Sequence, residues 1–332
     1  MYFKSFLKFI QQTSYFNVYF VIKYPLLKPI KYIPHKEIDK EAWNHCVDNA
    51  INQMVYAYAW FLDVVSPNWD ALVLGNYEAI MPLPQRKRFT LSYLAQPLFT
   101  QQLGVFYSNL AHMNATNDFL AAIPDKFKLI EINLNTFNIP SLSSFITNTN
   151  ITCHLELNKT YDELKSQYSE QIIRNIKKAQ KNILTIDNKI SPETIIDLFK
   201  ENKGKGIKNF KKKSYQLLLS LTKVLSDNNA IECIGAKINS DDYIAGIIFI
   251  RFNDAIILLF SGANAEAKST GAMSLLIDSY IKANASSQFL FDFEGSNNKD
   301  LARFYLGFGS KPVNYFNIRK NNLPKIIRWV KG

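Results

Sequence analysis

Three apolar segments in the second half of the chain constrain its fold most strongly. They read AIECIGAKI, YIAGIIFIRF and AIILLFSGAN, and they follow one another within residues 230–264. Only short stretches separate them, and one of these contains the turn-forming pair Asn253-Asp254. Strands joined by connections this short run antiparallel. The segments therefore predict a three-stranded antiparallel meander, which requires a fold built on a β-sheet.

The segments on either side of the meander predict an α/β lobe. Before it come a strand, a helix over residues 161–182, a short strand and two further helices; after it come a helix, a strand, a helix and a strand. Thr160, with Glu163 three residues later, has the spacing of a capping box. Ser191 is the expected cap of the next helix, with Pro192 in its first turn. These signals fix where the helices begin.

The first half of the chain repeats this kind of order. Asp39 is the expected cap of a helix that Pro67 ends, and Tyr56, Trp60 and Val64 are spaced to lie on one face of that helix. Several strands, a helix and another strand follow. The first half therefore also predicts a sheet accompanied by helices.

The length and the repeated order predict two lobes. A chain of 332 residues is long for a single core. We expect an N-terminal lobe at residues 31–150 and a C-terminal lobe at residues 151–332, each a mostly antiparallel mixed sheet flanked by helices. Residues 1–30 are basic and aromatic in short bursts, and we expect a loosely attached extension or a membrane-surface anchor there.

Composition excludes several classes of function. The net charge of +11 favours anionic partners such as phosphorylated cofactors, nucleic acid or a membrane face, although lysines that only aid solubility explain it equally well. The cysteines and histidines show no metal-binding or disulfide spacing: Cys46, Cys153, Cys233, His35, His45, His112 and His154. No apolar run reaches eighteen residues, so we expect no transmembrane segment. Together with the lack of a signal-peptide pattern, this predicts a cytoplasmic protein without a metal site.

Two carboxylates stand at the end of a predicted strand, in the segment QFLFDFEG. Asp292 and Glu294 alternate with Phe291 and Phe293, so both acidic side chains face one side. Two neighbouring carboxylates can raise the pKa of one of them, which makes a general base for an amine. A solvated strand end or a helix cap is the alternative.

The order of elements in the second half resembles the GNAT acyltransferase fold. In that family the loop after the fourth strand leads into a helix whose backbone N–H groups hold the pyrophosphate of a coenzyme. The matching stretch here is NAEAKSTGAMSLLI, where Lys268, Gly271 and Ala272 fall on the family pattern and Met273 departs from it. The resemblance implies acyl-CoA or another acyl carrier as co-substrate rather than a tightly bound cofactor.

The loop of residues 268–272 is the predicted carrier site, so Ser269 and Thr270 belong to it as well. Capping and packing are the alternative roles for Ser269 and Gly271.

A tyrosine near the end of the chain matches a second GNAT signature. Tyr305 and Gly309 in FYLGFG stand in a Y-x-x-x-G relation. The resemblance implies that Tyr305 protonates the leaving thiolate, and a phenol suits this role because its usual pKa near 10 lies close to that of a thiol. A half-buried structural tyrosine is the alternative.

Two GNAT-like halves in tandem resemble the Fem-type aminoacyl and peptidyl transferases and the acetyltransferase-6 group. PLFTQQLGVF, RNIKKAQKN and DFEGS…ARFYLGFGSKPVNYF carry this resemblance. We expect Arg174 and Lys178 to bind an anion in the cleft between the lobes, with a solvated basic face as the alternative. Gln101 and Gln102 are the candidates for binding the acceptor, with packing or turn roles equally open.

The resemblance implies an N-acyltransferase. It would move an acyl or aminoacyl group from acyl-CoA, an acyl carrier protein or aminoacyl-tRNA to an amine, directly and without a covalent enzyme intermediate. The chain lacks the coiled-coil insertion that some Fem-type enzymes use to engage tRNA, so no such arm supports a tRNA donor. The alternative is a catalytically inactive GNAT-like protein that binds an anionic ligand or polymer, which Met273 slightly favours.

Overall fold

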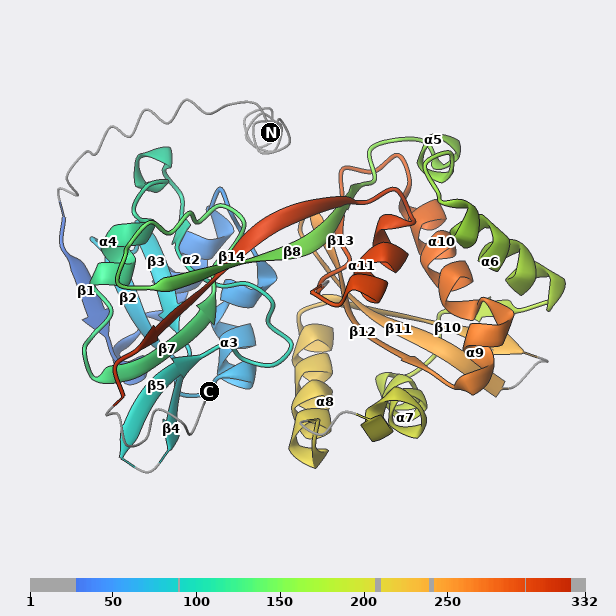
Figure 1. The fold of residues 1–332 in the computed structure, drawn as a ribbon. Coiled ribbons are helices and arrows are strands. Elements are labelled where there is room, and N and C mark those ends of the chain that lie inside the picture. Colours follow the sequence, from blue (N-terminus) through green and yellow to red (C-terminus); the bar gives the residue numbers. More distant parts are fainter. Residues whose placement is uncertain (1–27, 89, 207–209, 239–241, 296, 324–332) are drawn as a thin grey trace.

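The computed structural model describes residues 28–88, 90–206, 210–238, 242–295 and 297–323. The extension predicted at residues 1–30 lies almost wholly outside these residues, so the structure says nothing of how it is attached. The described chain forms two lobes side by side (Figure 1).

The strands form two sheets. The smaller has the antiparallel order β1-β2-β3-β6 and belongs to the N-terminal lobe. Its strands are β1 (Ile30–Ile33), β2 (Asp70–Leu74), β3 (Ala79–Leu83) and β6 (Phe106–Tyr107). The larger has ten strands in the order β4-β5-β7-β14-β8-β13-β12-β11-β10-β9. Within it only β5·β7 and β12·β13 are parallel pairs. The prediction of mixed, mostly antiparallel sheets is confirmed.

The larger sheet extends through both lobes. The bounds of its strands are β4 (Gln85–Arg88), β5 (Leu91–Ala95), β7 (Phe127–Asn133), β8 (Ile146–Glu156), β9 (Thr185–Asp187), β10 (Ile231–Ile238), β11 (Asp242–Phe252), β12 (Ala255–Ala263), β13 (Leu290–Asp292) and β14 (Lys311–Asn321). The predicted meander is β10, β11 and β12.

Two long strands, β8 and β14, join the lobes. β14 pairs with β8 from Lys311 to Arg319, and its end pairs with β7 of the N-terminal lobe from Asn317 to Asn321. Both strands therefore cross from one lobe to the other (Figure 1). β14, the last strand among the described residues, completes a sheet that the first half begins, and residue 150 lies inside β8.

Helices cover these sheets. They are η1 (His35–Glu37), α2 (Lys40–Asp48), η2 (Val55–Ala57), α3 (Ala59–Val65), η3 (Leu110–His112), α4 (Thr116–Ala121), α5 (Tyr161–Lys165), α6 (Glu170–Lys181), α7 (Pro192–Glu201), η4 (Lys203–Gly206), α8 (Lys212–Asp227), α9 (Ala265–Thr270), α10 (Ala272–Asn284) and α11 (Lys299–Leu306). The capping box at Thr160 and the cap at Ser191 are both present. The helix predicted over 161–182 is instead two, because Ser169 caps a second start at α6.

The single helix predicted between Asp39 and Pro67 is wrong. α2 ends at Asp48, and the segment after it is bonded to β6. Asn52 Nδ2 donates to Val105 O at 2.8 Å and Asn52 Oδ1 accepts from Tyr107 N at 3.2 Å. Because these bonds replace helical ones, Tyr56 lies on the short turn η2 and not on a helix face.

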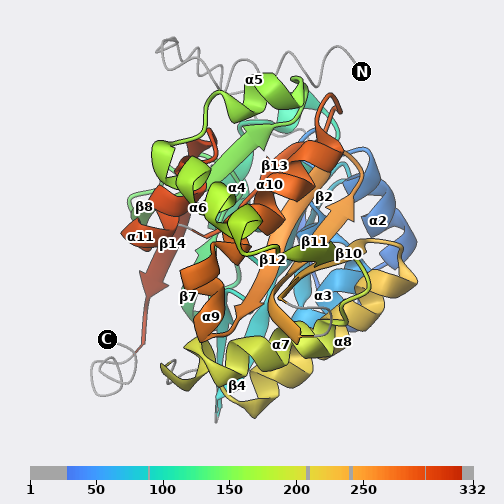
Figure 2. The ribbon, with the colours of Figure 1, turned by 90° about the vertical axis from the view of Figure 1, so that its right-hand side faces the viewer.

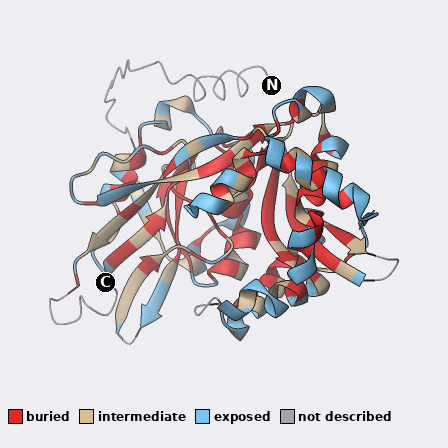
Figure 3. Cartoon of the chain, turned by 45° about the vertical axis from the view of Figure 1, so that its right-hand side comes forward, coloured by how far each residue is buried: buried red, intermediate tan, exposed pale blue. Residues whose placement is uncertain are grey.

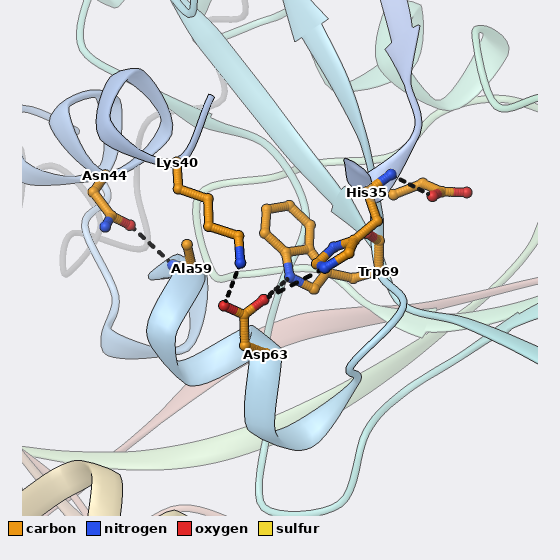
Figure 4. A network of polar contacts seen from close by, with 7 residues as sticks. His35, Lys40, Asn44, Ala59, Asp63 and Trp69 are labelled. Atoms are coloured by element: carbon orange, nitrogen blue, oxygen red, sulfur yellow. Dashed lines mark hydrogen bonds and ion pairs between the residues drawn. The ribbon is translucent and has the colours of Figure 1, made fainter. Parts of the chain in front are cut away.

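A polar network holds the two N-terminal helices together after this break. Asp63 on α3 accepts from Lys40 Nζ at 2.7 Å and from Trp69 Nε1 at 3.0 Å (Figure 4). Asn44 Oδ1 accepts from the backbone N–H of Ala59 at 2.9 Å and so satisfies a free donor at the start of α3. The position of η2, between α2 and α3, is fixed by these contacts.

The two lobes share one of the three apolar cores. Its N-terminal members include Trp43, Phe61 and Leu62, and its C-terminal members include Leu221 of α8 and Ile250 of β11. α3 packs against α8 across the boundary. Buried residues run through both lobes, while the outer faces of the helices are exposed (Figure 3). The junction between the lobes is therefore packed and can hold side chains from both halves in fixed positions.

Candidate functional site

The strands β12 and β13 part at the junction of the lobes. Their parallel pairing covers three residue pairs and ends at Ile257 and Asp292. β12 continues to Ala263, and over the described residues this extension pairs only with β11. Glu294 follows β13 with φ of 50°, a conformation that costs a non-glycine residue energy. The sheet therefore opens where the two predicted carboxylates stand.

Asp292 is buried and bonded on several sides. Thr152 Oγ1 of β8 donates to its Oδ1 at 2.5 Å, and the backbone N–H of Glu294 donates to the same oxygen at 2.9 Å. His154 Nε2, also from β8, lies 3.3 Å from Asp292 Oδ2. These contacts tie the end of β13 to β8 and fix the orientation of the backbone N–H of Glu294.

Glu294 faces the N-terminal lobe. The hydroxyl of Tyr56, on η2, donates to Glu294 Oε1, which joins residues 238 positions apart in the sequence. The pKa of Glu294 is raised to about 8: burial raises it most, the hydrogen bond from Tyr56 lowers it, and the charge of Asp292 raises it by a smaller amount. A carboxyl group with this pKa populates both protonation states near neutral pH and can accept or donate a proton there.

The charge of Glu294 raises the pKa of two more tyrosines, Tyr305 and Tyr315. Tyr305 of α11 is buried, and its ring centroid lies 5.1 Å from that of Phe293. Burial raises the pKa of Tyr305, and the charge of Glu294 adds to the effect. Burial raises the pKa of Tyr315 on β14 to about 12, with Glu294 as the next cause. Both phenols therefore keep their protons at neutral pH, so in a proton transfer each can give up a proton but cannot take one.

The structure thus brings Asp292, Glu294 and Tyr305 into one region. Sequence reasoning missed Tyr56 and Tyr315. Tyr315 lies in KPVNYF, part of a motif that carries the family resemblance, but that motif assigns it no role, and the apolar spacing around Tyr56 predicts a helix face instead. Only the packing of η2 against the end of β13 reveals it.

Gln101 and Gln102 lie in the loop between β5 and β6, which reaches the other lobe. Phe99 of this loop has its ring centroid 5.8 Å from that of Phe210 beside α8. Gln102 is fully buried: its Nε2 donates to Gln101 Oε1 at 2.7 Å and its Oε1 accepts from Thr136 N at 3.0 Å. Gln101 is 9% exposed, and its Nε2 has no hydrogen-bond partner among the described residues. Gln101 keeps an amide donor for a further partner, whereas Gln102 is held by the fold.

The predicted carrier loop, residues 268–272, spans the end of α9 and the start of α10. Lys268 and Ser269 are exposed, and Thr270, Gly271 and Ala272 are buried. Both hydroxyls donate to Glu266 O, from Ser269 at 2.8 Å and from Thr270 at 3.0 Å.

The start of α10 lies against α6. A Cβ built on Gly271 would stand 2.3 Å from Asn175 O. Since α6 covers this side of the loop, binding of a carrier at residues 268–272 stays a prediction.

Arg174 and Lys178 are exposed on α6, which packs on α10 through Ile172 and Ile176. The helix lies on the side of the C-terminal lobe that faces away from the N-terminal lobe (Figures 1 and 2). The two side chains are therefore not between the lobes, contrary to the expectation above. Amphipathicity correctly indicated which face of α6 is exposed, but it carries no information on where the other lobe lies.

The described part of the chain has neither a metal-binding cluster nor a helix that could span a membrane. No group of three or more His, Cys, Asp or Glu side chains there could hold a metal ion. No helix among those residues is long and apolar enough to cross a membrane.

Comparison with known proteins identifies the fold. No protein-family model and no curated protein sequence matches the chain. Among solved structures, FemX superposes with a TM-score of 0.64 at 11% identity, covering 90% of this chain and 99% of that one. L-PGS from Bacillus licheniformis gives 0.55 at 10% identity, with coverages of 88% and 95%.

A tandem GNAT protein from the clavulanic acid biosynthesis pathway gives 0.50 at 10% identity, with coverages of 90% and 100%. These likenesses confirm the tandem GNAT-like, Fem-type fold predicted from the order of elements.

Proposed function

We propose that the protein is an N-acyltransferase that moves an acyl or aminoacyl group from a carrier directly to an amine. One observation carries the proposal: Glu294, with a pKa near 8, stands where β12 and β13 part and is held from the other lobe by Tyr56. Perturbed carboxyl groups and strained backbone concentrate at functional sites. The tandem GNAT-like fold supports the same class of reaction.

In the proposed reaction Glu294 is the general base. Its carboxylate accepts the proton of the attacking amine as the new C–N bond forms, and the bond between the acyl carbon and the carrier then breaks. Tyr305 donates its phenolic proton to the leaving group, a transfer that its raised pKa makes easier to an alkoxide than to a thiolate, and the phenolate regains a proton from Glu294 or from solvent. Each of these transfers contributes roughly 10²–10⁴-fold in enzymes of this kind.

The donor and the acceptor approach from different sides in this proposal. The carrier, which is acyl-CoA, an acyl carrier protein or aminoacyl-tRNA, is held at residues 268–272. The acceptor lies at the junction of the lobes, where Gln101 offers its unpaired amide donor. A polar group of the acceptor that receives this bond removes the cost of a buried unsatisfied N–H.

The proposal is tested by Glu294→Gln. Acetyl-CoA, a longer acyl-CoA and aminoacylated tRNA are each offered with primary amines, and amide formation is followed in single turnover. We expect the wild-type rate to rise as the pH increases through about 8, because a base must be deprotonated. The variant should lose this dependence and about 10²–10⁴-fold in rate.

Glu232→Gln is the matched control, because Glu232 also accepts from a tyrosine, Tyr280, at 2.5 Å, but on β10 in the C-terminal lobe. An equal loss of rate in both variants would show that Glu294 is not the general base. Failure of the wild type to form an amide from any of the three donors would contradict the proposal itself.

A binding protein without chemistry is the second candidate, and one observation favours it. α6 lies against Gly271, and Met273 packs on the apolar core, so the predicted carrier loop is partly covered. Equilibrium dialysis with acetyl-CoA separates the two: binding without turnover supports this candidate, and turnover excludes it.

A further inference from the structure

The end of α6 has a residue that its backbone conformation disfavours. Ile183 N donates to Gln180 O at 3.0 Å and Leu184 N donates to Ala179 O at 3.3 Å, which is the Schellman pattern of a helix end. The position after the cap Asn182 takes a left-handed conformation, and Ile183 has φ of 53° there. Glycine is usual at this position, because a β-branched side chain clashes with the backbone.

The fold gains no packing from this isoleucine. Ile183 is 80% exposed, a larger fraction than for any other exposed large apolar side chain in the described chain. Ile186, three residues later on the edge strand β9, is 38% exposed. An apolar residue that is both strained and exposed is explained by neither folding nor solubility.

Positively charged side chains line the helix that leads to this apolar end. Arg174, Lys177, Lys178 and Lys181 are exposed along α6, and none of them forms an ion pair within the residues that the structure describes. Lys181 lies two residues before Ile183, and the exposed Lys189 follows β9. The surface therefore combines an apolar tip with a row of free positive charges.

We propose that the C-terminal end of α6 and β9 is a docking surface for an anionic lipid bilayer. Ile183 and Ile186 enter the boundary between headgroups and acyl chains, and the four cations of α6 lie among the anionic headgroups. Interfacial segments of proteins combine these two features. A nucleic acid would use the same cations, but it offers no apolar medium for an exposed isoleucine, so the bilayer is the better match.

The position of α6 is compatible with docking. The helix lies on the outer side of the C-terminal lobe, opposite the N-terminal lobe (Figures 1 and 2). A bilayer that contacts α6 therefore does not cover the junction at Glu294. The proposal does not depend on the proposed function, since docking requires no turnover.

Vesicle binding tests the proposal. The full chain is sedimented with vesicles of phosphatidylcholine alone or mixed with phosphatidylglycerol, and we expect binding only to the mixed vesicles. Ile183→Gly should weaken this binding about tenfold, because the buried apolar area is lost. It should leave the melting temperature unchanged or higher, since glycine relieves the strain. Ile139→Gly, at a residue that is 50% exposed elsewhere, is the matched control and should bind as the wild type does.

A charge variant tests the other half of the surface. Arg174, Lys177, Lys178 and Lys181 are changed to Gln together, and binding should fall at least about 100-fold, since each cation near an anionic surface contributes roughly fivefold. The control changes four exposed lysines of the α8 region to Gln and so alters the net charge equally: Lys211, Lys212, Lys213 and Lys223.

Three results would overturn the proposal: equal binding to neutral vesicles, equal loss in the charge control, or unchanged binding of Ile183→Gly. Binding to single-stranded RNA that needs the cations but not Ile183, without vesicle binding, would identify a nucleic-acid surface instead.

Discussion

The end of β13, predicted to supply catalytic carboxylates, and the start of α10, predicted to hold the acyl carrier, differ in how well their residues suit their backbone conformations. Both contain a residue with positive φ. At the start of α10 that residue is Gly271, which adopts the conformation without strain and fits closely against Asn175. At the end of β13 it is Glu294, whose carboxyl group is also removed from water and bonded across the lobes to Tyr56.

The two residues differ in whether their unusual backbone conformation helps the fold or costs it stability. Gly271 has a structural explanation, because any larger residue would collide with α6. At Glu294 the hydrogen bond from Tyr56 accompanies two features that cost stability, a buried carboxyl with a raised pKa and a strained backbone. Local conflicts of this kind are expected at functional sites, where other contacts maintain them. The comparison therefore supports the proposal that the chemistry takes place at the end of β13.

The largest expected effect comes from Tyr305→Phe, which removes the proposed proton donor beside Glu294. Turnover should fall about 10²–10⁴-fold, because only the phenolic proton is lost while the ring still packs on Phe293. Single-turnover amide formation measures the rate, and a thermal melt should show nearly unchanged stability. Tyr280→Phe is the control, since this tyrosine is also buried but bonds Glu232. A fully active Tyr305 variant would leave Tyr305 a packing residue.

An intermediate effect is expected at the other member of the comparison. Gly271→Ala places a Cβ 2.3 Å from Asn175 O at φ of 79°. The left-handed conformation and the overpacking together should lower the free energy of unfolding by about 2–4 kcal/mol. Urea denaturation measures this change. Gly206→Ala, at a glycine with open space around it, should change the free energy of unfolding by less than about 1 kcal/mol. A stable Gly271→Ala protein would mean that α6 yields easily and that the loop can open for a carrier.

Much of the fold could be predicted because its signals are local. The apolar meander, the capping box at Thr160 and the carboxylates at a strand end each lie within a few neighbouring residues. The pairing of β14 with β7 could not be predicted. The sequence pattern of a strand does not indicate which strand it pairs with, and here the two strands are almost 200 residues apart. The sequence therefore assigns β14, one of the two strands that join the lobes, to the C-terminal half alone.

The candidate site was predictable only in part for the same reason. Asp292, Glu294 and Tyr305 fall within one segment of the sequence, and a motif connects them. Tyr56 depends on a helix break, and that break depends on Asn52 bonding to the distant strand β6. Helical spacing favoured the wrong structure there, because tertiary hydrogen bonds outweighed a local pattern.

The smallest expected effect tests whether the two lobes cooperate at the site. The bond from Tyr56 lowers the pKa of Glu294 against the larger effect of burial. Tyr56→Phe removes this donor, so the pKa of Glu294 should rise above about 8 and the rising limb of the rate profile should move to higher pH. The base is then less often deprotonated at pH 7, and turnover there should fall up to about tenfold, as a one-unit shift requires. At pH values well above both limbs the variant and the wild type should converge, because Glu294 is ionised in each. Tyr280→Phe should leave the limb in place. A limb that stays fixed or moves to lower pH in Tyr56→Phe would show that the N-terminal lobe only packs against Glu294 and does not tune it.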